Sequence, residues 1–151
     1  MQKQSLAAIA MLMHEFIDLF GLKKADVENW LARPTVQLHT KYQKTNSGRS
    51  RRFTRLNVTE LALIGAFVAS GVKASDAALF VNVLMDEQRF SISGGKRFYA
   101  FAPHDHLNGV PMQELNSSAL TKLIENSPRG SIAIIDIGGI FQRVETLFAE
   151  I

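Results

Sequence analysis

The chain of 151 residues contains no cysteine. This absence excludes disulfide bonds, thiolate metal sites and a cysteine nucleophile, and it fits a reducing compartment. Long apolar runs are also missing, because the longest one, from Leu6 to Met13, is too short to cross a bilayer. No small-residue cleavage site of a secretory signal follows that run. We therefore expect a cytoplasmic protein without a membrane span.

Positive charge is concentrated in the first half of the chain. The net charge is +3, but residues 1–75 hold 11 basic and 5 acidic side chains, whereas residues 76–151 hold 6 and 9. Residues 41–55 include six basic side chains and no acidic one, with Tyr42 and Phe53 interleaved among them. The six are Lys41, Lys44, Arg49, Arg51, Arg52 and Arg55. This pattern is typical of segments that neutralise phosphates and predicts a polyanionic partner, with a solvated basic loop as the alternative.

The apolar spacing predicts two helices joined by a glycine turn near the N-terminus. The first covers Ser5–Phe20 with Ser5 as its N-cap, Gly21 ends it, and the second covers about Lys24–Ala32. This spacing is that of a helix-turn-helix, whose second helix presents its outer face to a major groove. That face carries Lys23, Lys24, Asp26, Glu28 and Asn29. An ordinary helical hairpin is the alternative interpretation.

A basic hairpin is predicted after the second helix. Val36–Tyr42 alternates apolar and polar residues, Thr45–Gly48 favours a turn, and the chain returns through Arg51–Phe53. The outward side chains of such a hairpin would straddle a phosphate backbone or place an arginine in a narrow minor groove.

Two core helices are predicted next. Asn57 or Thr59 caps the third helix, Glu60 completes a capping box with Asn57, and Gly71 lies at the C-cap. A fourth helix begins at the N-cap Ser75 and ends near residue 87.

The second half has the pattern of a small β-β-α-β-α unit. A two-glycine turn and a polar loop separate its elements. These are expected as strands Arg89–Ser93 and Lys96–Ala102, the loop Pro103–Asn116, helix Ser117–Asn126, a buried strand Ser131–Ile137 and an amphipathic segment Ile140–Ile151. We therefore predict an α+β protein with an N-terminal, mostly helical domain over residues 1–87 and an α+β domain over residues 88–151. The second domain is small for an independent core, so we expect it to dimerise or to regulate.

The basic run carries a family resemblance. Residues Gly48–Leu61, followed by Ile64 and Gly71, resemble the wing and third helix of MerR-type winged helix-turn-helix regulators. In that family a glycine is followed by an Arg-x-aromatic-Ser/Thr step, a capped helix and a further glycine. Phe20–Leu22 and Val27–Trp30 resemble the helix-turn-helix of the family and its aromatic end. The resemblance covers about residues 12–86.

The resemblance implies double-stranded DNA binding, with contacts from Lys24, Asn29, Arg49, Arg51 and Arg52. The outer face of the second helix adds Lys23, and the basic cluster adds Lys41, Lys44 and Arg55. Two departures limit what is carried over. Glu28 stands where the family usually has a phosphate-contacting arginine, and a strand-rich unit replaces the long coiled-coil helix.

Three other groups contain side chains that could carry chemistry. His104-Asp105-His106 has two imidazoles and a carboxylate but no third ligand at fixed spacing, which favours a polar loop over a metal site. Gly94-Gly95-Lys96 lacks the length of a phosphate-binding loop and favours a hairpin turn. Asp136, at a strand end, favours a turn or helix-cap role over an active-site carboxylate. We expect no catalytic residue, no cofactor and no metal.

The sequence thus predicts a sequence-specific transcription regulator that binds double-stranded DNA and is not an enzyme. We expect a homodimer through the C-terminal half on a symmetric operator, with repression favoured over activation. Two alternatives stay open: an excisionase-like architectural factor that bends DNA, and a protein-interaction adaptor whose basic hairpin meets an acidic partner.

Overall fold

A computed structural model describes residues 10–44, 50–87, 97–111 and 116–150 of the chain. The architecture is α+β, as predicted. The helices are α2 (Lys24–Ala32), α3 (Arg55–Ala69), α4 (Ala74–Glu87), α5 (Ser117–Glu125) and α6 (Ile137–Ala149), with 3-10 turns η1 (Met13–Glu15) and η2 (Pro103–Asn108). The strands are β1 (Ala10–Leu12), β2 (Arg52–Thr54), β3 (Phe98–Phe101), β4 (Val110–Pro111) and β5 (Ala133–Asp136).

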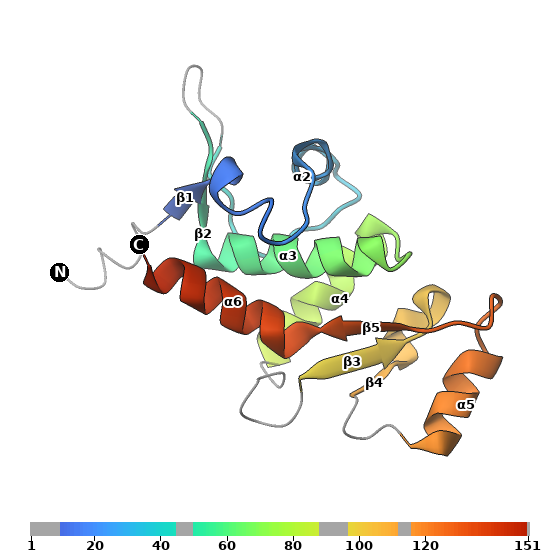
Figure 1. Ribbon diagram of the computed structural model, residues 1–151. Helices are drawn as coiled ribbons and strands as arrows, with labels where there is room; N and C mark the ends of the chain where they lie inside the picture. Colours follow the sequence, from blue (N-terminus) through green and yellow to red (C-terminus); the bar gives the residue numbers. More distant parts are fainter. Residues whose placement is uncertain (1–9, 45–49, 88–96, 112–115, 151) are drawn as a thin grey trace.

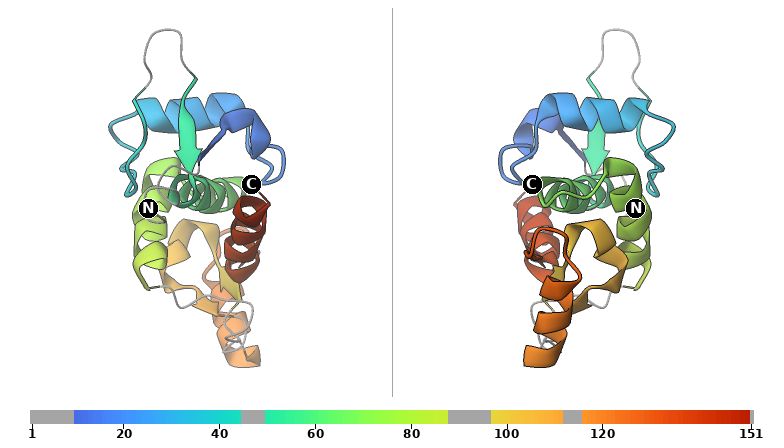
Figure 2. Two further views of the ribbon diagram at one scale, coloured as in Figure 1. Left: turned by 90° about the vertical axis from the view of Figure 1, so that its left-hand side faces the viewer. Right: turned by 90° about the vertical axis from the view of Figure 1, so that its right-hand side faces the viewer.

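The helix α3 lies at the centre of the molecule (Figure 1). On one side of it lie the β1-β2 sheet and α2, and on the other side lie the three-stranded sheet and α5. Figure 2 shows α4 and α6 flanking α3, with α2 and α5 at opposite ends of the molecule.

The first helix predicted, over residues 5–20, is wrong, because the described residues 10–20 form the strand β1, the short 3-10 turn η1 and further turns, and no α-helix. Residues 10–12 form the strand β1 instead, which pairs antiparallel with β2 so that Met11 faces Phe53. Both of these side chains are buried. An apolar run fits a strand as well as a helix, and here the distant partner decides. Residues 1–9 lie outside the described part of the chain.

Gly21 ends a short run of helical turns, as predicted. The amide of Leu22 donates to the Ile17 carbonyl at 2.8 Å, and the amide of Gly21 donates to the Asp18 carbonyl at 3.2 Å. These two bonds form a Schellman motif, which needs a left-handed residue, and Gly21 has φ +63°. Leu22 then packs on α3 at Gly65, where an added Cβ would stand 2.2 Å from the Leu22 Cδ2 atom.

The second helix predicted is confirmed as α2, but the hairpin after it is not. Residues 33–44 form no strand, and β2 pairs with β1 rather than with Val36–Tyr42. The physical reason is that this segment is held by the side chains of α3, as described below. The predicted turn at residues 45–48 lies outside the described residues.

The helix α3 begins earlier than the sequence pattern indicates, because its N-cap is Thr54 rather than Asn57 or Thr59. Its N-cap is Thr54, whose hydroxyl accepts from the Asn57 amide at 3.2 Å while Asn57 Oδ1 accepts from the Thr54 amide at 3.0 Å. Neither Asn57 nor Thr59 is the cap, because both lie inside the helix. The C-cap is Ser70, and Gly71 follows it with φ +103°. The predicted N-cap Ser75 is likewise inside α4, which begins at Ala74.

The second half follows the predicted order, with shifted boundaries. The second predicted strand and the predicted helix are confirmed as β3 and α5, while Arg89–Ser93 and the two-glycine turn lie outside the described residues. Within the expected polar loop, η2 and the short strand β4 form, and β4 pairs with β3. The strand β5 is only half buried, since Ile134 is 52% exposed, and α6 begins at Ile137 rather than at residue 140.

One apolar core contains buried residues from both halves of the chain. The ring of Phe67 on α3 lies 5.3 Å from Phe80 on α4 and 5.1 Å from Phe101 on β3. On α6, Arg143 donates to the Leu19 carbonyl and lies 4.8 Å over the Phe20 ring. The apolar packing therefore crosses the predicted domain boundary at residue 87.

Candidate nucleic-acid interface

The two segments predicted to contact DNA lie at the same end of the molecule. The helix α2 and the stretch leading into β2 are both on the side of α3 away from the three-stranded sheet (Figures 1 and 2).

The helix α2 is held by its apolar side and exposes the rest. Val27 and Trp30 are buried against the core. Lys23, Lys24 and Asn29 are all exposed, as a base-reading helix requires. Lys24 is not unpaired, because its Nζ atom lies 3.8 Å from Glu28 Oε1 on the next turn. Asn29 is on a different side of the helix from this pair, by the 3.6-residue period.

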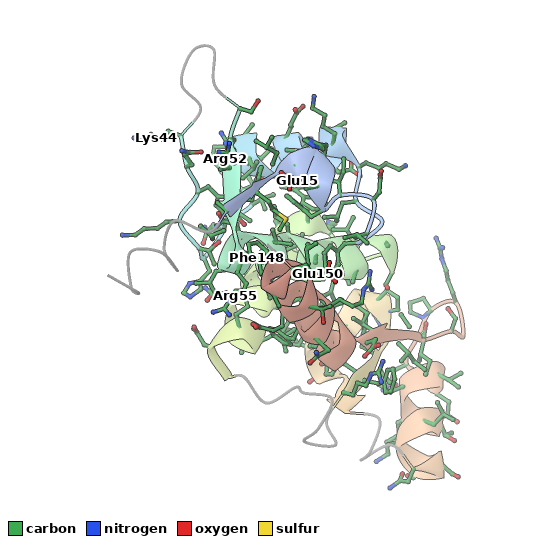
Figure 3. The ribbon with its side chains drawn as sticks, turned by 60° about the vertical axis from the view of Figure 1, so that its left-hand side comes forward. Glu15, Lys44, Arg52, Arg55, Phe148 and Glu150 are labelled. Carbon is green, nitrogen blue, oxygen red and sulfur yellow. The ribbon has the colours of Figure 1, made fainter. Side chains whose placement is uncertain are left out.

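The two ends of the basic stretch are bridged at its base. The Arg52 amide donates to Gln43 Oε1 at 2.7 Å, although Gln43 is not in a strand. Figure 3 shows Lys44 and Arg52 at the same end of the molecule. Lys41, Lys44 and Arg52 are exposed and Arg51 is half buried. Arg49 lies outside the described residues.

A buried carboxylate holds the start of this stretch. Glu60 on α3 is fully buried. Its Oε2 atom accepts from the His39 amide at 2.6 Å, and its Oε1 atom accepts from the Thr40 hydroxyl at 2.6 Å and from the Tyr42 hydroxyl at 2.8 Å. Oε1 also accepts from the Thr40 amide at 3.2 Å. Such multiple hydrogen bonds offset the cost of burying a carboxylate.

Asn57 and Tyr42 complete this Glu60 clamp. Asn57 Nδ2 donates to the Thr40 hydroxyl at 2.9 Å and to the Lys41 carbonyl at 3.0 Å. Burial, and then the negative charge of Glu60, raise the pKa of Tyr42 far above its ordinary value, so its hydroxyl stays a donor. The clamp turns the acid inward and fixes residues 39–42 while their basic neighbours face solvent.

The clamp was missed at the sequence level. The sequence spacing predicts a capping box between Glu60 and Asn57, whereas both residues bind the preceding segment. The available signal was the position of Glu60, directly before the apolar run Leu61–Ile64. An acid at such a position must find several donors.

Arg55 does not point to the same region as Arg52. Its Nη1 atom lies 3.1 Å from the carboxylate of Glu145 on α6. Figure 3 shows Arg55 near the end of α6 that carries Phe148. Arg55, one of the predicted DNA contacts, therefore forms an ion pair with α6 in the second half of the chain.

A pocket of about 530 Å³ lies between α2 and the β1-β2 sheet. Its lining comes from β1, η1 and the turns after it, from one side of α2, and from the residues at β2. The lining residues are Leu12, Met13, His14, Ile17, Lys24, Glu28, Leu31, Ala32, Ser50, Arg51 and Phe53. Two predicted DNA contacts, Lys24 and Arg51, thus share this pocket.

Asp136 and Asp105, two further polar residues named in the sequence analysis, make hydrogen bonds that support the local fold. Asp136 is the N-cap of α6, as favoured, and accepts from the Gly139 amide at 2.9 Å. It also receives two hydrogen bonds of 2.7 Å from Arg97. Asp105 Oδ1 accepts from Asn108 Nδ2 at 2.8 Å. Gly94-Gly95-Lys96 lies outside the described residues.

Within the described ranges, no group of three metal-ligating side chains is found. In the same ranges, no helix is both long enough and apolar enough to cross a membrane.

Comparisons with protein-family models, with curated proteins and with solved structures give no match to this chain.

Proposed function

We propose that the protein is a transcription regulator that binds double-stranded DNA, with repression favoured over activation. In this proposal the N-terminal elements act as a winged helix-turn-helix. The turns from Met13 to Gly21 serve as its first helix, α2 as its second, and the segment between Gln43 and Arg52 as its wing. The resemblance of residues 12–86 to MerR-type regulators supports this reading of the sequence.

The observation that carries the proposal is the separation of charge around the Glu60 clamp. The chain has no acidic residue between Asn29 and Thr59. Glu60, the next acid, is turned into the core and hydrogen bonded there, while Lys41, Lys44 and Arg52 are exposed. The outside of this segment is therefore positive, and α2 lies at the same end of the molecule (Figure 1).

The mechanism divides the contacts into two kinds. Lys44 and Arg52 neutralise phosphates and set the position of the protein on the duplex, without reading sequence. Asn29 on α2 reads base edges in the major groove, where an amide side chain can bond adenine in a bidentate manner.

We propose further that the protein acts as a homodimer through its C-terminal half. The described part of α5 has no buried residue, and Phe98, Ile124 and Ile134 are large apolar residues that are at least 37% exposed. A two-fold partner would cover such residues and would place two α2 helices on symmetric half-sites.

The first experiment is a fluorescence-anisotropy titration of a random duplex at two salt concentrations, with light scattering on the same sample. We expect binding that weakens steeply with salt and a mass twice that of the chain. No binding even at low salt would overturn the proposal in favour of an acidic protein partner. A strong bend in a circular-permutation assay, without effect on a promoter reporter, would favour an architectural role.

Two variants with the same charge change test the location of the interface. Arg52→Gln should weaken binding on all sequences and lower the slope of log affinity against log salt by about one. Arg129→Gln, at an exposed position in the second half, should leave both unchanged. Asn29→Ala should reduce discrimination between sites by about tenfold per half-site with the slope retained. Equal losses for the two arginine variants would place the duplex elsewhere.

A further inference from the structure

We propose that the pocket between α2 and the β1-β2 sheet binds a small aromatic anion, a carboxylate or sulfonate carried on an apolar ring system. Binding to this pocket does not depend on the proposed function, whereas its coupling to DNA does. The volume of about 530 Å³ lies in the range of small-molecule sites, roughly 300–1,000 Å³.

The inner part of the pocket is apolar and aromatic. Phe53 is fully buried, and its ring is held edge-on by Phe16 at 5.2 Å and by Tyr42 at 6.3 Å. Leu12, Met13 and Ile17 add apolar surface from the other strand and the turns after it. A flat apolar ring fits this surface, because it would remove the partly exposed side chains of Leu12, Met13 and Ile17 from water.

The charged side chains of the pocket set the sign of the ligand. Lys24 and Arg51 come from two different segments, and Glu28 is the single acid among the lining residues. Glu28 lies 3.8 Å from Lys24, so an incoming anion competes with it for that ammonium group. The balance of the lining favours an anion, and Arg51 offers the fork geometry that carboxylates and sulfonates prefer.

Occupation of the pocket couples to the duplex. Lys24 and Arg51 line the pocket and are also among the predicted DNA contacts. A bound anion and a DNA phosphate would compete for the same cations, so each would weaken the binding of the other by the same factor. This step makes the pocket an effector site, and it rests on the proposed function.

The test uses 1-anilinonaphthalene-8-sulfonate as probe on the full chain. We expect saturable fluorescence enhancement at one probe per chain and an unfolding midpoint that rises with probe concentration, because the probe binds the folded state. The neutral analogue N-phenyl-1-naphthylamine should bind about tenfold more weakly. Unsaturable enhancement with a falling midpoint, or equal affinity for the neutral analogue, would overturn the proposal.

Substitutions with matched controls locate the probe. Ala32→Trp fills the pocket from the last residue of α2 and should abolish binding, whereas Ala69→Trp makes the same change at the exposed last residue of α3 and should not. Arg51→Gln should weaken binding about tenfold. Glu28→Gln should strengthen it several-fold, and Asp26→Asn, outside the lining, should have no effect. Wild-type binding by Ala32→Trp would overturn the assignment of the site.

The coupling is measured separately on a labelled duplex. The probe should displace the duplex from the wild-type chain and not from Ala32→Trp. If the duplex binds but is not displaced, the coupling is wrong. If the chain binds no duplex while the probe results hold, the proposed function fails and the pocket stands.

Discussion

At the scale of single residues, Glu60 determines how the basic stretch leaves the core. Its carboxylate accepts hydrogen bonds from two backbone amides and two hydroxyls, all from residues 39–42. A backbone segment without strand partners still needs its amides satisfied, and the side chain supplies what a sheet ladder would otherwise supply. This is why Val36–Tyr42, which alternates like a strand, has no strand neighbour.

Removing the clamp should therefore cost more than removing any single donor. Glu60→Gln places an amide nitrogen against donors that need an acceptor, and we expect a loss of about 2–3 kcal/mol in the free energy of unfolding. Tyr42→Phe removes one donor and should cost about 1 kcal/mol. Urea denaturation measures both.

The control for the clamp is Glu125→Gln, because Glu125 is exposed on α5. It should change stability by less than about 0.5 kcal/mol. A loss for Tyr42→Phe that equals the loss for Glu60→Gln would contradict the clamp as the common acceptor.

At the scale of elements, the sequence predicted those helices, turns and caps that depend on residues close together in the chain. The limits of α2 and α5, the glycine turn at Gly21 and the cap at Asp136 depend on neighbouring residues, and these predictions are confirmed. The strand β1 depends on β2, about forty residues away, so local helical spacing gave the wrong element. The Glu60 clamp and the pocket depend on tertiary contacts that no spacing rule contains.

The start of α6 depends on a single side chain that joins two elements. Asp136 caps the helix through Gly139 and receives two hydrogen bonds from Arg97, the residue before β3. The Arg97 guanidinium, and then the Gly139 amide, hold the pKa of Asp136 below its ordinary value of 3.8. This stabilisation is present above the unfolded-state pKa and is lost as the pH falls through the lower, folded-state pKa.

Two substitutions at Asp136 separate the cap from the ion pair. Asp136→Ala should cost about 1 kcal/mol at neutral pH, whereas Asp136→Asn keeps a good cap and should cost less. The stability of the wild type should decline below about pH 4, and the stability of both variants should decline less over the same pH range. Urea midpoints along a pH series measure this difference. An unchanged acid decline in both variants would contradict the role of this carboxylate.

At the scale of the whole molecule, the two halves share one core rather than meeting at a linker. Val144 on α6 is buried in the same cluster as Trp30 and Val27 of α2. Arg143 reaches from α6 to Leu19 and Phe20, and Arg55 reaches from α3 to Glu145. The elements proposed to bind DNA and the second half therefore pack on one shared core.

This continuity predicts a single cooperative unfolding transition. Trp30 is the only tryptophan and reports on α2, whereas Val144→Ala removes buried apolar surface in α6. The substitution should cost about 1–2 kcal/mol, and the urea midpoint seen by Trp30 fluorescence should shift as much as the midpoint seen by circular dichroism. Gln142→Ala, exposed on the same helix, is the control and should move neither midpoint. If Val144→Ala shifted the circular-dichroism transition and left the Trp30 transition in place, residues 1–87 would unfold as an independent domain.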